Sequence, residues 1–587
     1  MQKTAKTFLY SSLFVALFSA SVQAKQAPVI TVDAAQQAAM RYDVEMDIFH
    51  PVYAKQGMVA SEQMLATEVG LAILQQGGNA IDAAVAVGFA LAVVLPNAGN
   101  IGGGGFMLLH DAKTGNNTAL DFREVAPEKA HRDMYLDAQK NVIQGKSMYS
   151  HQAVGVPGTV AGLELALNKW GSMNLEQVLA PAIKLAEEGF VVSDTLAKIL
   201  QAEADNLKKW PASKAIFFNG DAPLKSGERL VQKDLAQSLN KIAKEGSSAF
   251  YKGDIAKAIV AEMQKHGGMI QLQDLASYKA IERETISGEY RGYQVVSMPP
   301  PSSGGIHLLQ ILNILSHFPL AELGANSAES IRLIAEASKL AYADRSEFLG
   351  DPAFVQMPVQ GLISKGYAQQ LANSIKPNQI RPAAEIKPGQ PQPFESDQTT
   401  HYSVVDQQGN MVGVTYTLNL NFGSGIVAEG TGILLNNEMD DFSAKPGVAN
   451  AFGLVGGDAN AIAAGKRPLS SMMPTFILKD NKPWMVTGSP GGARIITTVL
   501  QTVINSIDYG MNPAEAASVP RIHHQWQPDE LRVEKGLSQD TLNLLNNWGY
   551  DVQTKASMGR TQTIQIRDDG FYGYSDPRNP DGGTLGY

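Results

Sequence analysis

The chain has 587 residues, a formal net charge of −9 and no cysteine. The missing thiols exclude disulfide bonds, thiolate metal ligands and a cysteine nucleophile. The acidic balance, without a long run of lysine or arginine, argues against nucleic acid as a partner. With 44% hydrophobic and 18% charged residues the composition is that of a globular protein, and a chain of this length can bury a large core.

The first 24 residues have the pattern of a secretory signal peptide. Lys3 and Lys6 supply positive charge, the stretch from Phe8 to Phe18 is mostly apolar, and Ala24 ends a small-residue site for signal peptidase. The apolar stretch is too short to span a bilayer. We therefore expect cleavage after residues 1–24, export to the periplasm or secretion, and no association of the mature chain with a membrane.

The first element predicted beyond the leader is a buried helix. Asn79 is a suitable N-cap, the residues up to Leu95 are apolar on all sides, and Pro96 ends the run. Four consecutive glycines follow at residues 102–105. A phosphate-binding loop would follow a strand and carry Lys-Ser/Thr, which this run does not, so we expect a tight buried turn.

Helical patterns alternate with short polar loops from residue 155 to residue 375. The clearest helix is predicted over Ile331–Ala343, and the turn Pro299–Gly305 is expected to precede another helix. The next segment, Lys376–Gln398, is polar, contains five prolines and has neither a helical nor a strand period. It is predicted to be a tether.

Thr399 directly follows the tether and leads into a β-rich stretch. Cleavage before Thr399 would give it a free α-amine beside its own hydroxyl, so that one residue supplies nucleophile and general base. An α-amine has a pKa of about 7.7–8.0, well matched to accepting a proton near neutral pH. Threonine is common in strands for structural reasons alone, so the hypothesis of self-cleavage depends on the tether and the neighbouring motifs together. His401 is not needed as a base, and we expect it to be structural.

Strands and one amphipathic helix are predicted after the tether. Thr399 is expected to be the first residue of the first strand, a rigid position suited to a catalytic group. The predicted strands are Thr400–Val405, Met411–Leu418, Phe476–Leu478 and Trp484–Thr487, and the predicted helix is Arg494–Ile507.

Four ordered motifs resemble those of the γ-glutamyltranspeptidases, which belong to the N-terminal-nucleophile hydrolases. They are TTHYS at 399–403, NNEMDDF at 436–442, RPLSSM at 467–472 and GSPGG at 488–492. The resemblance covers essentially the whole chain after the leader and implies an α/β fold, a four-layer αββα sandwich. It also implies a precursor cut into a large subunit, 25–398, and a small catalytic subunit, 399–587, which stay together as a heterodimer in one folded unit.

The activity implied by the resemblance is γ-glutamyl transfer and glutathione hydrolysis without a cofactor. The Thr399 hydroxyl first attacks the carbonyl of Gln398, forming an ester that water opens. It then takes the γ-glutamyl group from glutathione or another γ-glutamyl compound and passes it to water, an amino acid or a peptide. Thr417 is implied to hydrogen-bond to the reacting oxygen, and strand geometry predicts Thr415, Thr417 and Asn419 on one face.

Gly491 and Gly492 lie immediately before the predicted helix that starts at Arg494. The first N–H groups of a helix have no internal partner and lie at its positive end. Glycine lets a reacting carbonyl approach closely, so the pair is a candidate oxyanion hole. A Ser-Pro-Gly-Gly turn is also frequent without any function.

Both charges of the amino-acid end of a γ-glutamyl group need partners. The residues that the resemblance implies are Arg123, Ser470 and Ser471 for the α-carboxylate, and Asn419, Glu438 and Asp441 for the α-ammonium. Arginine suits the first role because its planar fork meets a carboxylate with two hydrogen bonds. Glu438 takes a position where bacterial relatives often have glutamine. The alternative for residues 438–441 is a solvated acidic turn.

The glycine-rich stretch from Lys445 to Arg467 resembles the family's lid, with Phe452 where many relatives have a gating tyrosine. A lid counts against the relatives that degrade poly-γ-glutamate. No metal site is predicted, because the adjacent His523 and His524 would splay apart and the chain has no His-Glu-x-x-His helix.

Two alternatives to the transpeptidase remain open. A related acylase acting on glutaryl or polymeric γ-glutamyl substrates would keep the nucleophile and lose amino-acid recognition. An exported binding protein that never matures would bind γ-glutamyl compounds without turning them over.

Overall fold

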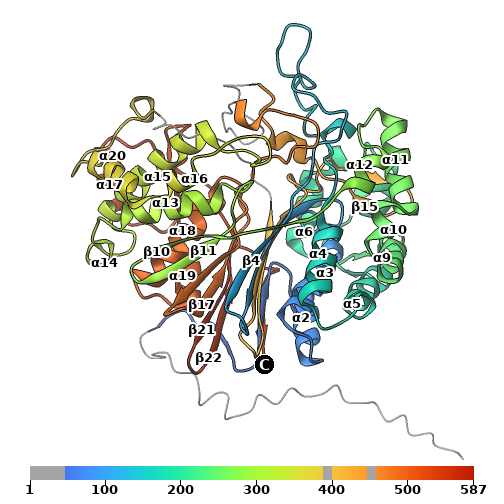
Figure 1. Ribbon diagram of the computed structural model, residues 1–587, viewed down its shortest axis with the longest axis horizontal. Helices are drawn as coiled ribbons and strands as arrows, with labels where there is room; N and C mark the ends of the chain where they lie inside the picture. Colours follow the sequence, from blue (N-terminus) through green and yellow to red (C-terminus); the bar gives the residue numbers. More distant parts are fainter. Residues whose placement is uncertain (1–46, 388–398, 446–457) are drawn as a thin grey trace, which may run out of the picture. The chain divides into compact units, whose positions relative to one another are not determined.

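The computed structural model describes residues 47–387, 399–445 and 458–587, and residues Ile48–Tyr587 form a single unit (Figure 1). The predicted leader, the end of the tether with Gln398, and Phe452 lie outside the described residues. No helix among the described residues is long and apolar enough to cross a bilayer.

One seven-stranded antiparallel sheet has the strand after the tether near its centre. This strand pairs with its hairpin partner on one side and with an N-terminal strand on the other. In spatial order the sheet contains β23 (Gly583–Gly586), β2 (Met58–Ser61), β12 (Thr400–Val405), β13 (Met411–Thr417), β3 (Gly104–Asp111), β4 (Asn116–Phe122) and β9 (Ile281–Arg283).

A second seven-stranded antiparallel sheet faces the first. Its inner side chains, such as Phe476 and Val486, belong to one core with Phe106 and Met411 from the first sheet. In spatial order it contains β1 (Val52–Ala54), β22 (Gly570–Ser575), β21 (Gln562–Arg567), β17 (Lys482–Thr487), β16 (Thr475–Lys479), β11 (Tyr293–Ser297) and β10 (Ile286–Tyr290).

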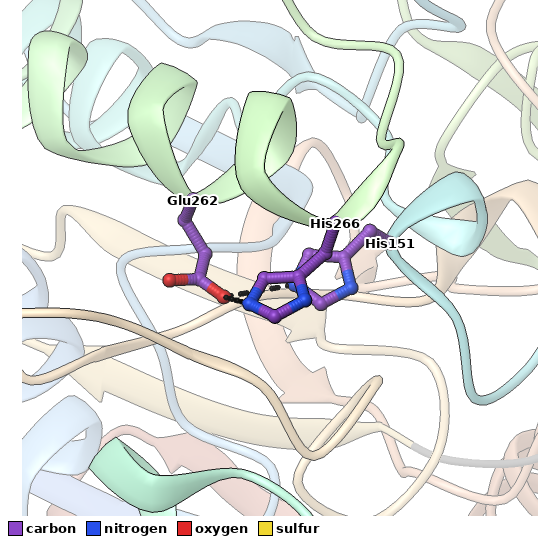
Figure 2. Close-up of side chains that lie close together, drawn as sticks. All are labelled: His151, Glu262 and His266. Carbon is purple, nitrogen blue, oxygen red and sulfur yellow. Dashed lines mark hydrogen bonds and ion pairs between the residues drawn. The ribbon is translucent and has the colours of Figure 1, made fainter.

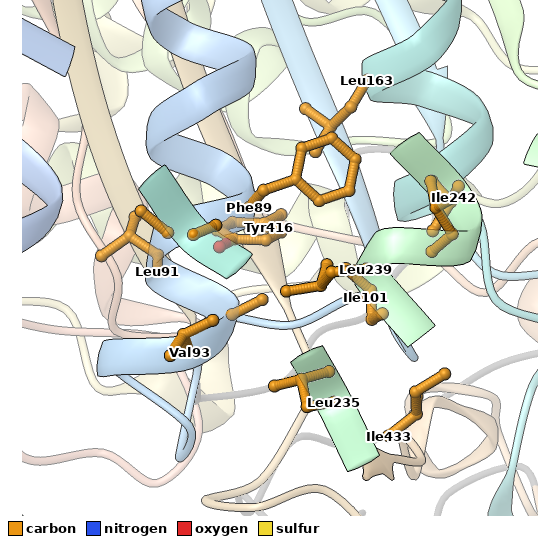
Figure 3. Close-up of a cluster of buried hydrophobic side chains, with 14 of the residues drawn as sticks. Phe89, Leu91, Val93, Ile101, Leu163, Leu235, Leu239, Ile242, Tyr416 and Ile433 are labelled. Atoms are coloured by element: carbon orange, nitrogen blue, oxygen red, sulfur yellow. The ribbon is translucent and has the colours of Figure 1, made fainter. Parts of the chain in front are cut away.

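Helices cover the outer face of each sheet, completing the predicted four-layer αββα sandwich (Figure 1). The first sheet is covered by α2 (Met64–Gln75), α3 (Ala80–Val94), α4 (Thr159–Trp170), α5 (Leu175–Glu188) and α9 (Lys233–Glu245), and the second by α13 (Gly304–Leu315), α15 (Ala328–Phe348) and α18 (Arg494–Ile507). Figure 3 shows part of the first helical core, where Phe89 of α3 lies in one cluster with Leu163 of α4 and Leu239 of α9.

The prediction of a buried helix after Asn79 is confirmed. The Asn79 side chain caps α3, and Asp82 closes the capping box by accepting the Asn79 backbone N–H at 2.8 Å. Every residue of α3 is buried, which explains why its sequence is apolar on all sides.

The predicted turn over residues 102–105 is only half right, because Gly104 and Gly105 belong to β3. A Cβ atom on Gly105 would lie 2.5 Å from the Cα of Tyr416 on the adjacent strand β13. These glycines therefore allow the backbones of neighbouring strands to approach closely within the sheet. In the sequence alone, glycines with this role look the same as glycines that form a loop.

The predicted strands and the predicted helix over Arg494–Ile507 are confirmed within two residues, whereas α15 begins three residues before the predicted helix and ends five residues after it. Helix α18 has the predicted bounds, α15 contains the predicted helix and extends it at both ends, and α13 follows the turn at 299–305. β13 ends at Thr417 rather than at Leu418, and β12 begins at Thr400, so that Thr399 immediately precedes the strand.

Candidate active site

Thr399 lies at the open end of the hairpin formed by β12 and β13. Its exposed fraction is 3%, and the next residue, Thr400, pairs with Tyr416 across β12 and β13. Continuing this antiparallel register by one residue places Thr399 opposite Thr417. The two threonines that the resemblance singles out, 18 positions apart in the chain, are thus brought together by strand pairing.

His401 is buried between the sheets with both ring nitrogens engaged. Nδ1 lies 2.8 Å from Oγ1 of Thr415, and Nε2 lies 3.1 Å from Oγ of Ser403. Burial lowers the pKa of His401 to about 3, so its imidazole is neutral. The ring packs on Gly488, where an added Cβ would lie 2.3 Å from the imidazole. These contacts favour the structural role predicted for His401.

Asn419 does not lie on the same strand face as Thr415 and Thr417, contrary to the prediction. The chain leaves β13 after Thr417, and Asn419 has a left-handed φ of 77°. Its backbone N–H donates to Oγ1 of Thr417 at 2.8 Å, and its side-chain Nδ2 donates to the carbonyl of Asn437 at 3.0 Å. Asn419 therefore connects the end of the hairpin with the acidic segment that starts at residue 438.

Gly491 and Gly492 form the entry to α18. Their φ values are 137° and 57°, in the region that favours glycine, and their carbonyls accept the N–H groups of Arg494 at 3.0 Å and Ile495 at 2.9 Å. Their own N–H groups precede the first turn of the helix, where the helix dipole is positive. The loop starts at Gly488, which packs against His401, so it lies beside the strand that Thr399 leads.

A buried arginine and three carboxylates form the charged part of the site. The Arg123 guanidinium donates to Oε1 of Glu438 and to Oδ2 of Asp441, and the Glu124 carboxylate lies 3.5 Å away. The carbonyls of Pro468 at 3.3 Å and Leu469 at 3.0 Å accept further Arg123 protons. The predicted partners of an α-carboxylate and of an α-ammonium are thus in direct contact with each other.

Electrostatics in this cluster are set by burial. Burial raises the pKa of Glu438 well above its usual value, and raises that of Glu124 to about 7 against the opposing effect of Arg123. Although burial alone lowers the pKa of Arg123, the surrounding carboxylates raise it. One cation facing three carboxylates leaves negative charge in excess when all are ionised, which suits an incoming ammonium group.

Glu124→Gln should remove a pH dependence of stability. A folded-state pKa near 7, above the ordinary value of 4.5, means that the native state binds the extra proton between those pH values. The stability that protonated Glu124 contributes to the folded state is therefore present at pH 4.5 and is lost as the pH rises to 7. The free energy of unfolding falls by about 1.4 kcal/mol per pH unit over this range. Urea unfolding of both proteins at pH 5 and pH 7 should show wild type losing stability relative to the variant. A pH-independent difference would contradict the raised pKa.

Ser470 and Ser471 directly follow the carbonyl of Leu469 that binds Arg123. Ser470 is fixed by a hydrogen bond from its N–H to the carbonyl of Pro301 at 2.9 Å, within the Pro299–Gly305 turn. The buried Oγ of Ser471 has no hydrogen-bond partner among the described residues. The serines thus extend the Arg123 side of the cluster with a hydroxyl available to a ligand.

Glu62, which the sequence did not single out, connects strand β12 with the loop that contains Gly491 and Gly492. Its Oε1 accepts the backbone N–H of His401 at 3.3 Å, and its Oε2 accepts Nε of Arg560 at 2.6 Å. The backbone N–H of Arg560 in turn donates to Oγ of Ser489 at 2.8 Å. No motif indicates this connection, since Glu62 is 339 positions from His401.

Glu62→Gln should destabilise the protein by about 1.5–3 kcal/mol, the range for a hydrogen bond to a charged group. The amide can still accept from His401, but the pairing with Arg560 loses its charge. Urea denaturation against Glu68→Gln, an exposed site on the adjacent helix α2, provides the comparison. Equal stabilities of the two variants would show that the Glu62–Arg560 pair contributes nothing.

His523 and His524 engage different partners. His523 contacts Oγ1 of Thr497 and Oε1 of Gln525, both at 2.8 Å, whereas His524 lies 3.3 Å from Asp529. The two rings do not converge on one point, in agreement with the predicted splaying.

A threonine that immediately precedes a central strand of an αββα sandwich is the arrangement of the N-terminal-nucleophile hydrolases. The chain matches the family model described as Gamma-glutamyltranspeptidase over residues 66–586. The chain therefore belongs to the γ-glutamyltranspeptidase family.

Two curated relatives cover nearly the whole chain. A glutathione hydrolase proenzyme of Escherichia coli (strain K12) is 61% identical over 548 residues, 93% of this chain and 94% of the relative. An acylase ACY 1 proenzyme of Pseudomonas sp. (strain SE83) is 38% identical over 529 residues, 89% of this chain and 91% of the relative.

Solved structures show the same fold. The cephalosporin acylase from Bacillus halodurans superposes with a TM-score of 0.82 at 32% identity, covering 92% of this chain and 97% of that one. The Helicobacter pylori γ-glutamyltranspeptidase gives a TM-score of 0.55 at 50% identity, covering 55% of this chain and 93% of that one.

Proposed function

We propose that this protein is a γ-glutamyltransferase and glutathione hydrolase that cleaves its own precursor before Thr399. The observation that carries the proposal is the register of β12 and β13, which sets buried Thr399 opposite Thr417, in a chain 61% identical to a glutathione hydrolase proenzyme. The products of cleavage are the large subunit 25–398 and the small subunit 399–587. The leader, residues 1–24, directs the precursor to the periplasm.

In the first half-reaction the Thr399 α-amine accepts the hydroxyl proton as Oγ1 attacks the γ-carbonyl of glutathione. The backbone N–H groups of Gly491 and Gly492 stabilise the tetrahedral oxyanion, and Thr417 donates a hydrogen bond near the reacting oxygen. Proton transfer to the departing nitrogen releases cysteinylglycine and leaves a γ-glutamyl ester on Thr399. Water then yields glutamate, and an amino acid or peptide amine yields a new γ-glutamyl product.

Substrate recognition follows from the charged cluster. Arg123, with Ser470 and Ser471, receives the α-carboxylate, while Asn419, Glu438 and Asp441 receive the α-ammonium. A bound zwitterion replaces part of the internal pairing between Arg123 and the acids, so that each buried charge keeps an opposite partner.

The second candidate, a glutaryl acylase, has support from the acylase relative and from the acylase structure. The buried acids beside Arg123 favour the γ-glutamyl compound, because a glutaryl group has no ammonium to pair with them. The test compares kcat/KM for γ-glutamyl and glutaryl p-nitroanilides. A site built for a polar group rejects the analogue lacking it by on the order of 10⁴; equal or reversed values would establish the acylase instead.

A further inference from the structure

A cluster of two imidazoles and a carboxylate lies outside the catalytic machinery. His151 comes from the short 3₁₀ helix η1 (His151–Ala153), and Glu262 and His266 lie four residues apart on α11 (Asp254–His266). Figure 2 shows the three side chains converging, with Oε1 of Glu262 placed 2.9 Å from Nε2 of His151 and 3.5 Å from Nε2 of His266. One ligand atom from each residue lies within 4.8 Å of the other two.

We propose that His151, Glu262 and His266 bind a divalent transition-metal ion, with Zn²⁺ as the reference ion. Two imidazole nitrogens and one carboxylate oxygen are a ligand set that this class of ion accepts, and a fourth position is left for water. The fourth ligand would enter from the side of His266, whose side chain is 36% exposed, whereas His151 and Glu262 are buried. This inference does not depend on the proposed function.

The cluster needs one rearrangement to hold an ion. The rings of His151 and His266 stack with centroids 4.6 Å apart and an angle of 19° between planes, and Trp210 packs edge-on against His151 at 4.9 Å. One ion cannot lie in the planes of two parallel rings, so one ring has to rotate. His266 is free to do so, because it is the last residue of α11, is partly exposed and is followed by Gly267 in a left-handed conformation.

The other two ligands are held in place by burial and by their contact with each other. His151 and Glu262 are both buried, and Nε2 of His151 lies 2.9 Å from Oε1 of Glu262. One oxygen of Glu262, Oε1, already faces Nε2 of both histidines. The protein therefore has two fixed ligands and one mobile ligand.

The segment that carries His151 also reaches the charged part of the active site. Four residues before His151, Oγ of Ser147 donates to Oδ1 of Asp440 at 2.5 Å, and the carbonyl of Met148 accepts Nδ2 of Asn437 at 2.9 Å. A metal ion joining His151 to α11 would therefore hold this segment in place. We expect saturating Zn²⁺ to raise the melting temperature.

Isothermal titration of chelator-stripped protein with Zn²⁺ tests the proposal, and Co²⁺ absorption reports tetrahedral coordination. We expect one ion per chain, at least a tenfold loss of affinity in His266→Ala and in Glu262→Gln, and no tetrahedral Co²⁺ spectrum in either variant. His317→Ala, at an exposed histidine in the turn after α13, is the control and should bind as wild type does. γ-Glutamyl hydrolysis, or thermal unfolding should the enzyme be inactive, verifies that each variant is folded.

Two results would overturn the proposal. Wild-type protein that binds no Zn²⁺ at millimolar concentration would show that the cluster is only a structural contact. A folded His266→Ala variant with unchanged affinity would place the ion elsewhere.

Discussion

Thr399→Ala should give a single uncut chain with no measurable γ-glutamyl transfer, while wild type gives two chains that meet between Gln398 and Thr399. The alanine keeps the backbone and removes both the attacking hydroxyl and, by preventing cleavage, the free α-amine that would act as base. Intact mass under denaturing conditions measures the cleavage, and release of p-nitroaniline from the γ-glutamyl anilide measures the activity. Thr399→Ser is the matched control and should still cleave, because it keeps the hydroxyl.

A wild-type chain that is exported, folded and uncut would refute the enzyme hypothesis. The remaining explanation would then be a binding protein for γ-glutamyl compounds, and the Arg123 cluster would be its binding site. A Thr399→Ala chain that is still cut at the same bond would instead assign the cleavage to another protease.

The elements around the nucleophile could be predicted because their signals are local. The helix α18 shows its apolar period over 14 residues, and the hairpin of β12 and β13 has alternating β-formers around a polar turn. Asn79 and Asp82 likewise form a capping pattern of four residues that indicates the start of α3. Such features need no knowledge of the rest of the chain.

The contacts that shape the site could not be predicted, because they join distant segments. Arg123 meets Glu438 across 315 positions and Glu62 meets Arg560 across 498, and neither pair has a spacing that a sequence pattern can show. The left-handed turn at Asn419 is also set by its packing against Asn437, which overrides the strand period assumed for it.

The histidine cluster lies between these two cases. Glu262 and His266 have the i, i+4 spacing of ligands on one helix face, which is visible in the sequence. His151, 111 positions earlier in the chain, joins this pair and completes a candidate metal site.

Gly491→Ala should lower kcat by about 10²–10³, the usual effect of losing an oxyanion donor, which corresponds to about 2.7–4 kcal/mol. The φ of Gly491 is 137°, where an L side chain is strained, although its Cβ would meet no atom closer than 3.6 Å. The backbone would therefore move to relieve φ, and the N–H groups of residues 491 and 492 would turn away from the oxyanion. KM should change little, because the interaction is made in the transition state.

The control for strain alone is Gly430→Ala, at an exposed glycine with a φ of 75° and no atom within 4 Å of the added Cβ. Both variants should lose a similar, modest amount of unfolding free energy in urea, but only Gly491→Ala should lose kcat. Rates are compared per cleaved chain, since the same N–H groups would also serve the self-cleavage step. If Gly491→Ala kept the kcat of wild type while sharing the stability loss of the control, the oxyanion donors would have to lie elsewhere, and the glycines would serve only the turn into α18.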